Sequence, residues 1–273
     1  MKLGLSSPLK HKSPEEWADK MVSLGAGSVV FPVDSTADQT TIDAYKNAAV
    51  SHNLIIAEVG VWKNTLDANL SERQKNIEYA IKQLKLADYL GARCCVNVVG
   101  TPCGPRWDGG YRGNFSPRVR DEAIEMIQEI IDKANPKKTM YTIESMPWMI
   151  PSGPDDYLKL IDEVGRKHFG VHLDIVNMIT SPERFFFNDI FIKECFEKLK
   201  GKICSCHLKD IKLLDDYTFC LKEVACGKGK LDIKLYAELA TAEDKDMPMI
   251  IEHLNTDNEY IKSIKYVTEL LTK

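Results

Sequence analysis

The feature that most constrains the fold is an alternation of short apolar runs with amphipathic segments, which occurs eight times along the chain. The amphipathic segments open with helix starts such as Ser13-Pro14 and Ser116-Pro117, where Ser can cap the helix and Pro fits its first turn. Strand followed by helix, repeated in this way, predicts a parallel (β/α)₈ barrel. The runs predicted as strands are Leu3–Ser6, Ser28–Val33, Leu54–Val61, Arg93–Val99, Thr139–Ile143, Phe169–Leu173, Ile203–His207 and Pro248–Ile251.

We therefore expect an α/β protein with a single TIM-barrel domain over residues 1–273. The alternative is a doubly wound open sheet, which normally carries a Gly-rich phosphate loop at its first strand-to-helix turn. The corresponding turn here is Leu5-Ser6-Ser7-Pro8, and it contains no Gly. This turn favours the barrel.

The charge balance argues against a polyanionic partner. The formal net charge is -4 and the pI is about 5.9, whereas nucleic acid is bound by clustered Lys and Arg. The chain has no stretch of ~18 apolar residues, and its N-terminus lacks the apolar core of a signal peptide. We expect a cytoplasmic protein that works without nucleic acid or membrane, with its eight cysteines as reduced thiols in the core.

Long segments follow four of the predicted strands. In a barrel, these segments lie together at the carboxyl ends of the strands, where such enzymes place their chemistry. Enlarged loops at that end predict a covered pocket. The segments are 101–116, 146–154, 178–189 and 210–232.

Four ionisable residues close predicted strands five to eight: Glu144, Asp174, His207 and Glu252. Each one alone fits a helix cap or an ion pair, but an unpaired buried carboxylate is costly and the four converge on one side of the rim. Three carboxylates and one imidazole suit one divalent cation, Mn²⁺, Mg²⁺, Co²⁺ or Zn²⁺, with positions left open for substrate oxygens. The sequence therefore predicts a metal site.

The residues around these positions resemble the xylose isomerase-like TIM barrels, a family that includes ketose 3-epimerases, inosose dehydratase and endonuclease IV. The resemblance implies one metal ion, with Mn²⁺ as the first choice, held by the four residues. It also implies that Glu144 and Glu252 move protons, while Asp174 and His207 are ligands alone. The segments that carry the resemblance are Ile143-Glu-Ser-Met-Pro-Trp148, His172-Leu-Asp-Ile-Val-Asn177, Cys206-His-Leu-Lys-Asp210, Gly227-Lys-Gly-Lys-Leu-Asp232 and Ile251-Glu-His253.

This resemblance implies an enzyme that acts on a small carbohydrate. We expect a divalent-metal-dependent isomerase or epimerase of a keto-sugar or related polyol, which abstracts a proton beside a carbonyl to give a stabilised enediolate. The alternative is a lyase of the same superfamily, either an inosose-type dehydratase or an enzyme that cleaves 3-keto-glycosides. A distant alternative is an endonuclease IV-like repair enzyme, disfavoured because its metal cluster needs additional His and Glu ligands.

Two departures from the ketose epimerases bear on the substrate. Those enzymes usually have His three residues after the strand-six Asp, and this chain has Asn177, which cannot act as an acid near neutral pH. Strand seven ends in His207-Leu-Lys209-Asp210, which is similar to the dehydratase and keto-glycoside branches. Both Asn177 and Lys209 are candidate substrate contacts, although Lys209 also fits a rim residue paired with an acid.

Three further candidates for substrate binding are Trp107, Trp148 and His172. The two tryptophans fall in loops over the expected site, where an aromatic face suits a sugar ring, although exposed tryptophans also anchor interfaces. His172 shares the face of Asp174 and is expected to lie beneath the metal.

Other residues have mainly structural interpretations. Glu58 fits a buried ion pair more readily than a place near the site, and His253 alternates to the far face of its strand. Phe185–Phe187 either roofs the pocket or contacts a second copy of the chain, and we favour the second copy. Gly227–Asp232 predicts a turn into a helix capped by Asp232, with a phosphate contact from Lys228 or Lys230 left open.

Overall fold

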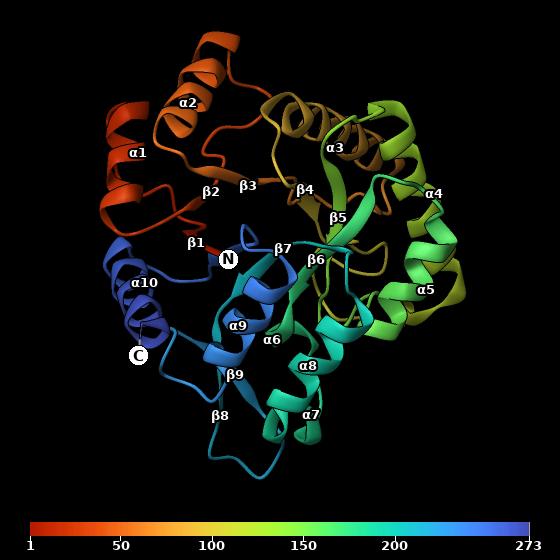
Figure 1. The fold of residues 1–273 in the computed structure, drawn as a ribbon. Helices are drawn as coiled ribbons and strands as arrows, with labels where there is room; N and C mark the ends of the chain where they lie inside the picture. Colours follow the sequence, from red (N-terminus) through yellow and green to blue (C-terminus); the bar gives the residue numbers. More distant parts are fainter. Residues whose placement is uncertain (273) are drawn as a thin grey trace.

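The computed structural model describes residues 1–272 and contains the predicted barrel. Eight parallel strands are paired in the order β1-β10-β7-β6-β5-β4-β3-β2 and curl into a nearly closed barrel, with helices ranged around it (Figure 1). All eight predicted strands are confirmed, several with shorter bounds. They are β1 (Lys2–Leu5), β2 (Ser28–Val30), β3 (Ile55–Gly60), β4 (Cys94–Asn97), β5 (Met140–Glu144), β6 (Phe169–Asp174), β7 (Ile203–Leu208) and β10 (Pro248–Ile251).

The helices begin where the sequence places caps. Ser13 accepts a hydrogen bond from the Glu16 amide at the start of α1, and Ser116 accepts one from the Val119 amide at the start of α4. The helices are α1 (Pro14–Ser23), α2 (Gln39–Ser51), α3 (Leu70–Leu90), α4 (Pro117–Ala134), α5 (Pro154–Val164), α6 (Ile175–Met178), α7 (Pro182–Phe186), α8 (Asn188–Lys198), α9 (Ile233–Glu243) and α10 (Asp257–Leu271), with a 3₁₀ turn at Arg112–Phe115.

The barrel closes where β1 meets β2, the two ends of the strand order. The Gly27 amide donates to the Leu3 carbonyl at 2.9 Å, and the Ser28 hydroxyl donates to the Lys2 carbonyl at 2.8 Å. Gly4 makes this approach feasible, because a Cβ on it would lie only 2.5 Å from the Ser28 carbonyl oxygen and from Ile250 Cδ1. Closure therefore depends on the missing side chain of Gly4.

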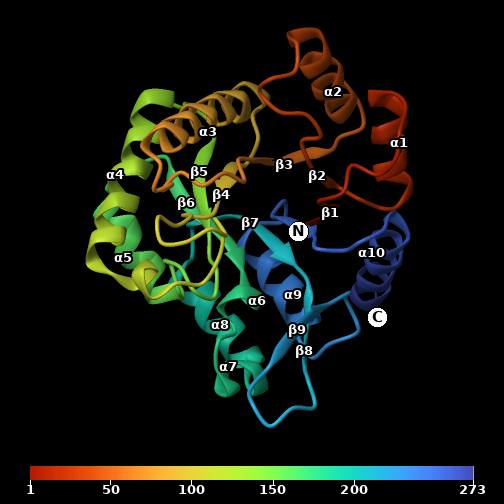
Figure 2. The ribbon, with the colours of Figure 1, turned by 180° about the vertical axis from the view of Figure 1, so that it is seen from behind.

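The segment after β7 contains an antiparallel hairpin that the sequence analysis did not predict, formed by β8 (Asp210–Leu213) and β9 (Leu221–Val224). Figure 2 shows this hairpin projecting from one side of the barrel. The chain then makes the predicted turn into α9, and Asp232 caps that helix by accepting from the Leu235 amide. The hairpin carries side chains toward the carboxyl ends of the barrel strands.

Asp210 holds this turn in place. Its buried carboxylate accepts hydrogen bonds from the amides of Ile211, Gly227, Gly229 and Leu231, at 2.8–3.0 Å. A Cβ on Gly229 would lie 2.3 Å from an Asp210 carboxylate oxygen, so glycine is required there. The backbone amides that a phosphate loop would offer are thus directed at the protein's own carboxylate.

The remaining expectations concern the surface and the thiols. All eight cysteines are free, and Cys206 is buried while Cys204 is partly exposed. Phe185 is buried in α7, whereas Phe186 and Phe187 are 63% and 58% exposed, so contact with a second copy stays a prediction. Within residues 1–272, the helices are all too short or too polar to cross a membrane.

The closure at Gly4 gives a test of the fold. Gly4→Ala forces its Cβ against the Ser28 backbone and is expected to lower the free energy of unfolding by about 1–3 kcal/mol, as overpacking does. Gly27→Ala is the matched control, because its Cβ would meet the flexible Lys2 side chain, at 2.9 Å. Denaturant unfolding measures both variants. Equal destabilisation by the two would contradict a specific role for Gly4.

Candidate metal centre

The four predicted ligands come together at the carboxyl ends of neighbouring strands. Glu144 ends β5, Asp174 ends β6, His207 lies in β7 and Glu252 follows β10. Each offers one ligand atom, and these atoms all lie within 4.8 Å of one another. His207 Nδ1 lies 2.8 Å from a Glu252 carboxylate oxygen and 3.3 Å from a Glu144 oxygen. All four residues are at most 5% exposed, so the cluster lies inside the barrel mouth.

Strand register and one amide side chain fix this arrangement. Asp174 pairs in register with His207, so both side chains reach the same level of the barrel. Asp174 also accepts from the Asn177 amide at 3.1 Å, and the Asn177 side chain donates to a Glu144 oxygen at 2.9 Å. Asn177 is 5% exposed and holds the ends of β5 and β6 together.

Two of the ligand atoms have charged neighbours but no aligned hydrogen bond. His207 Nδ1 and Asp174 Oδ2 are buried and have no hydrogen bond of acceptable geometry within residues 1–272. Lys209 Nζ lies 2.6 Å from Asp174 Oδ2, but this is an ion-pair contact without hydrogen-bond alignment. Buried polar atoms are rarely left in this state. Together with three carboxylates and one imidazole, these two atoms fit a divalent cation.

Lys209 supplies positive charge to the cluster. It is 2% exposed, and its ammonium lies 2.6 Å from Asp174, 2.6 Å from Glu252 and 3.2 Å from Glu223 on β9. Burial lowers the pKa of Lys209, but Asp174 and Glu252 outweigh this and raise it well above the usual range. Lys209 is therefore a buried cation among the predicted ligands. It is paired with acids, which was the second of the two interpretations given for it from the sequence.

The carboxylates respond differently to this environment. Burial raises the pKa of Asp174 to about 7, although Lys209 opposes the rise. Burial also raises the pKa of Glu252, but His207 and Lys209 outweigh it and hold that pKa well below its usual range. Glu252 is thus ionised near neutral pH. Asp174, with a pKa of about 7, is the carboxylate of the cluster that most readily takes up a proton there.

Glu58 lies beneath the cluster and is the centre of a second group of polar side chains. Its carboxylate lies 2.9 Å from His172 Nε2, 3.3 Å from His207 Nε2 and 2.5 Å from the Ser205 hydroxyl. The buried ion pair predicted for Glu58 is therefore present, with His172. Glu58 also lies next to the candidate metal site, through His207. The only sequence signal was an acidic residue inside the apolar run Ile55–Gly60.

A cavity of about 380 Å³ opens onto the cluster. Trp107 lines it, as predicted, and so does Trp62, which the sequence analysis missed and whose ring stacks at 26° to His207. Trp148 instead directs its indole N–H to the Asp108 carbonyl at 2.6 Å, and His172 is fully buried below. The lining residues are Ser6, Val30, Glu58, Trp62, Val98, Trp107, Asp108, Glu144, Met146, His207, Glu252 and His253.

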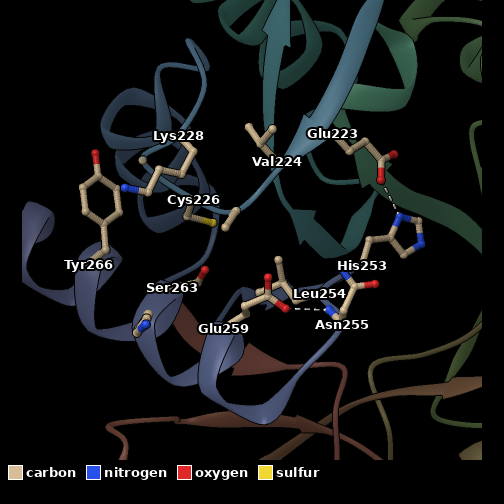
Figure 3. A pocket seen from close by; sticks show the side chains of 13 residues that line it. Glu223, Val224, Cys226, Lys228, His253, Leu254, Asn255, Glu259, Ser263 and Tyr266 are labelled. Carbon is tan, nitrogen blue, oxygen red and sulfur yellow. Dashed lines mark hydrogen bonds and ion pairs between the residues drawn. The ribbon is translucent and has the colours of Figure 1, made fainter.

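A larger groove of about 600 Å³ adjoins this cavity between β9 and α10 (Figure 3). His253 lines both spaces, and its Nδ1 lies 2.8 Å from Glu223, the contact drawn in the figure. The sequence analysis gave His253 a structural role; its side chain pairs with Glu223, but it is also 55% exposed and borders both spaces. Lys228 also lines the groove, whereas the predicted ligands Glu144, His207 and Glu252 line the smaller cavity.

Comparison with known proteins agrees with this architecture. Three solved structures cover nearly the whole chain at low identity, so the likeness concerns the fold. A xylose isomerase-like TIM barrel protein from Mycobacterium smegmatis, solved with magnesium, is 18% identical with a TM-score of 0.70, covering 100% of this chain and 96% of that one. The probable 3-DHS dehydratase from Bacillus anthracis is 18% identical with a TM-score of 0.72, covering 100% and 99%.

The third structure is the apo form of 3-keto-D-glucoside 4-epimerase from E. coli, which is 14% identical with a TM-score of 0.71 and covers 98% of this chain and 99% of that one. A comparison with curated protein sequences gives no match. The family model described as xylose isomerase-like TIM barrel matches residues 18–270. With its strand order and nearly full-length match, the chain belongs to the xylose isomerase-like TIM barrel family.

Proposed function

We propose that the chain is a divalent-metal-dependent isomerase or epimerase of a keto-sugar or related polyol. The observation that carries this proposal is the buried cluster of Glu144, Asp174, His207 and Glu252, which opens onto a cavity of about 380 Å³. The four residues would hold one ion, with Mn²⁺ as the first choice and Mg²⁺, Co²⁺ or Zn²⁺ as alternatives. When bound, such an ion supplies Lewis acidity that favours enediolate formation next to a substrate carbonyl.

Glu144 and Glu252 are the candidate acid and base, because both line the cavity and can reach a substrate. Glu252 is held ionised by His207 and Lys209, so it is in the form that can accept a proton. Glu144 is oriented by the amide of Asn177 and is the candidate that returns a proton to the carbon. It must take up that proton beforehand, because burial raises its pKa but His207 outweighs this and lowers it. With one group abstracting and the other returning the proton, the configuration at the carbon can invert.

The supporting residues take more limited roles in this proposal. Trp107 lines the cavity and offers an aromatic face to a sugar ring. Lys209 neutralises charge beside Glu252 and is the remaining candidate for contact with a substrate oxygen. Trp148, Asn177 and His172 act instead through their neighbours, because each directs its polar group at the protein.

A lyase is the second candidate, and the position of Lys209 favours it. The buried ammonium of Lys209, 2.6 Å from Glu252, would stabilise negative charge on a leaving oxygen after Glu252 has removed a proton from carbon, and the leaving oxygen would take its proton from water. The fold likeness to a probable 3-DHS dehydratase agrees with such chemistry. Elimination and epimerisation share the first proton abstraction and differ in whether a group leaves.

The metal assignment predicts loss of the ion when a ligand is changed. Elemental analysis of purified protein should find about one divalent ion per chain, and Glu252→Gln should lower that occupancy strongly, because an amide is a weaker ligand than a carboxylate. Glu78→Gln, on the exposed face of α3, is the matched control and should keep the ion. Absence of metal from the unmodified protein, even after soaking, would contradict the assignment.

Proton abstraction predicts exchange with solvent. In D₂O, with a panel of keto-sugars, ¹H NMR should show deuterium entering at the carbon beside the carbonyl. Glu252→Gln, assayed with enough Mn²⁺ to restore the occupancy of the unmodified protein, should slow this exchange about 10²–10⁴-fold, the usual contribution of a positioned acid or base. Turnover without label would instead indicate hydride transfer or hydrolysis, and loss of a group from the labelled product would favour the lyase.

A further inference from the structure

Glu58 is a buried acidic residue that the proposed reaction does not use. It belongs to β3, is 1% exposed, and extends toward β6 and β7. One oxygen accepts from the Ser205 hydroxyl at 2.5 Å and lies 2.9 Å from His172 Nε2. The other oxygen lies 3.3 Å from His207 Nε2. This geometry leaves the second oxygen directed at a predicted metal ligand.

The imidazole of His207 lies between two sets of carboxylates. Its Nε2 faces Glu58, and its Nδ1 faces Glu144 and Glu252. The ring has two aromatic neighbours, Trp62 at 26° with 6.4 Å between centroids and His172 edge-on with 4.1 Å between centroids. A neutral imidazole has one N–H and one lone pair, so the nitrogen that holds the proton decides which nitrogen can bind a cation.

We propose that Glu58 is a positioning residue that accepts the Nε2 proton of His207 in a hydrogen bond and so directs the Nδ1 lone pair at the metal. This inference rests on the proposed metal centre. A carboxylate behind a metal-bound histidine fixes its tautomer and orientation and raises its basicity. Loss of such a partner typically costs 10–100-fold in metal affinity.

The chemistry of the position calls for a carboxylate. Ser205, His172 and His207 can all donate to it, and an ionised carboxylate only accepts. In Glu58→Gln, one oxygen is replaced by an NH₂ group that donates. If that group faces His207, Nε2 must become the acceptor, and the proton moves to Nδ1, where it opposes metal binding.

The experiment compares metal affinity and tautomer in three proteins. Calorimetric titration with Zn²⁺ should show one ion per chain, with binding weakened 10–100-fold in Glu58→Gln. Ser205→Ala is the matched control, because it removes a different donor from Glu58 and leaves the oxygen facing His207, so its affinity should change less than about threefold. Thermal unfolding of the metal-free proteins separates loss of affinity from loss of the fold.

Long-range ¹H–¹⁵N spectra of the zinc-loaded unmodified protein test the proposal without any variant. The expected result is His207 protonated at Nε2 and bound through Nδ1. Binding through Nε2, unchanged affinity in Glu58→Gln, or a second ion held by Glu58, His172 and His207 would each overturn the role of Glu58. A protein that binds zinc as expected but shows no solvent exchange with keto-sugars would overturn the proposed function alone.

Discussion

The constraint on which the rest of the structure depends is the crowding of buried negative charge at the carboxyl end of the barrel. Glu58, Glu144, Asp174 and Glu252 are at most 5% exposed and lie in one connected group with His207. Carboxylates in such surroundings need cations or donors, because desolvation alone would cost several kcal/mol for each. The protein supplies Lys209, two imidazoles and the Asn177 amide, and two ligand atoms still lack hydrogen bonds within residues 1–272. The proposed divalent ion would complete this balance.

The barrel is suited to this crowding because three of the candidate ligands lie on its strands and the fourth, Glu252, directly follows β10. Four strands adjacent in the sheet, β5, β6, β7 and β10, each bring one ionisable side chain to the same level. The hairpin β8–β9 adds Glu223 from outside, and Asp210 fixes the turn that follows it. Ligand geometry is therefore set by strand register, whereas access to the cavity is set by elements that lie over it. Such a division allows the chemistry of a barrel to vary through its loops while its strands stay the same.

The strands and the clustering of the four candidate ligands could be predicted because both leave local signals. A charged residue at the end of an apolar run, such as Glu144, can be recognised in the sequence itself. The parallel topology then brings such strand ends together. Glu223 and His253 gave no comparable signal. Glu223 reaches Lys209 only because the unpredicted hairpin folds back over the rim, and His253 turns outward through a left-handed backbone conformation, with φ of 56°. Trp62 has a similar conformation, with φ of 49°, which alternation along a strand does not foresee.

The seam between β1 and β2 has a thermodynamic consequence under the proposed role of Glu58. The four ligands come from one continuous run of the sheet, but Glu58 comes from β3, near the opposite edge, where the order ends at β2. If the seam opened, β2 and β3 would be free to move away from β7, and the contact between Glu58 and His207 would be lost. Ion binding and integrity of the cylinder are then linked equilibria, so each favours the other by the same free energy. Metal binding would therefore slow amide hydrogen exchange in β1 and β2, although neither strand contributes a ligand.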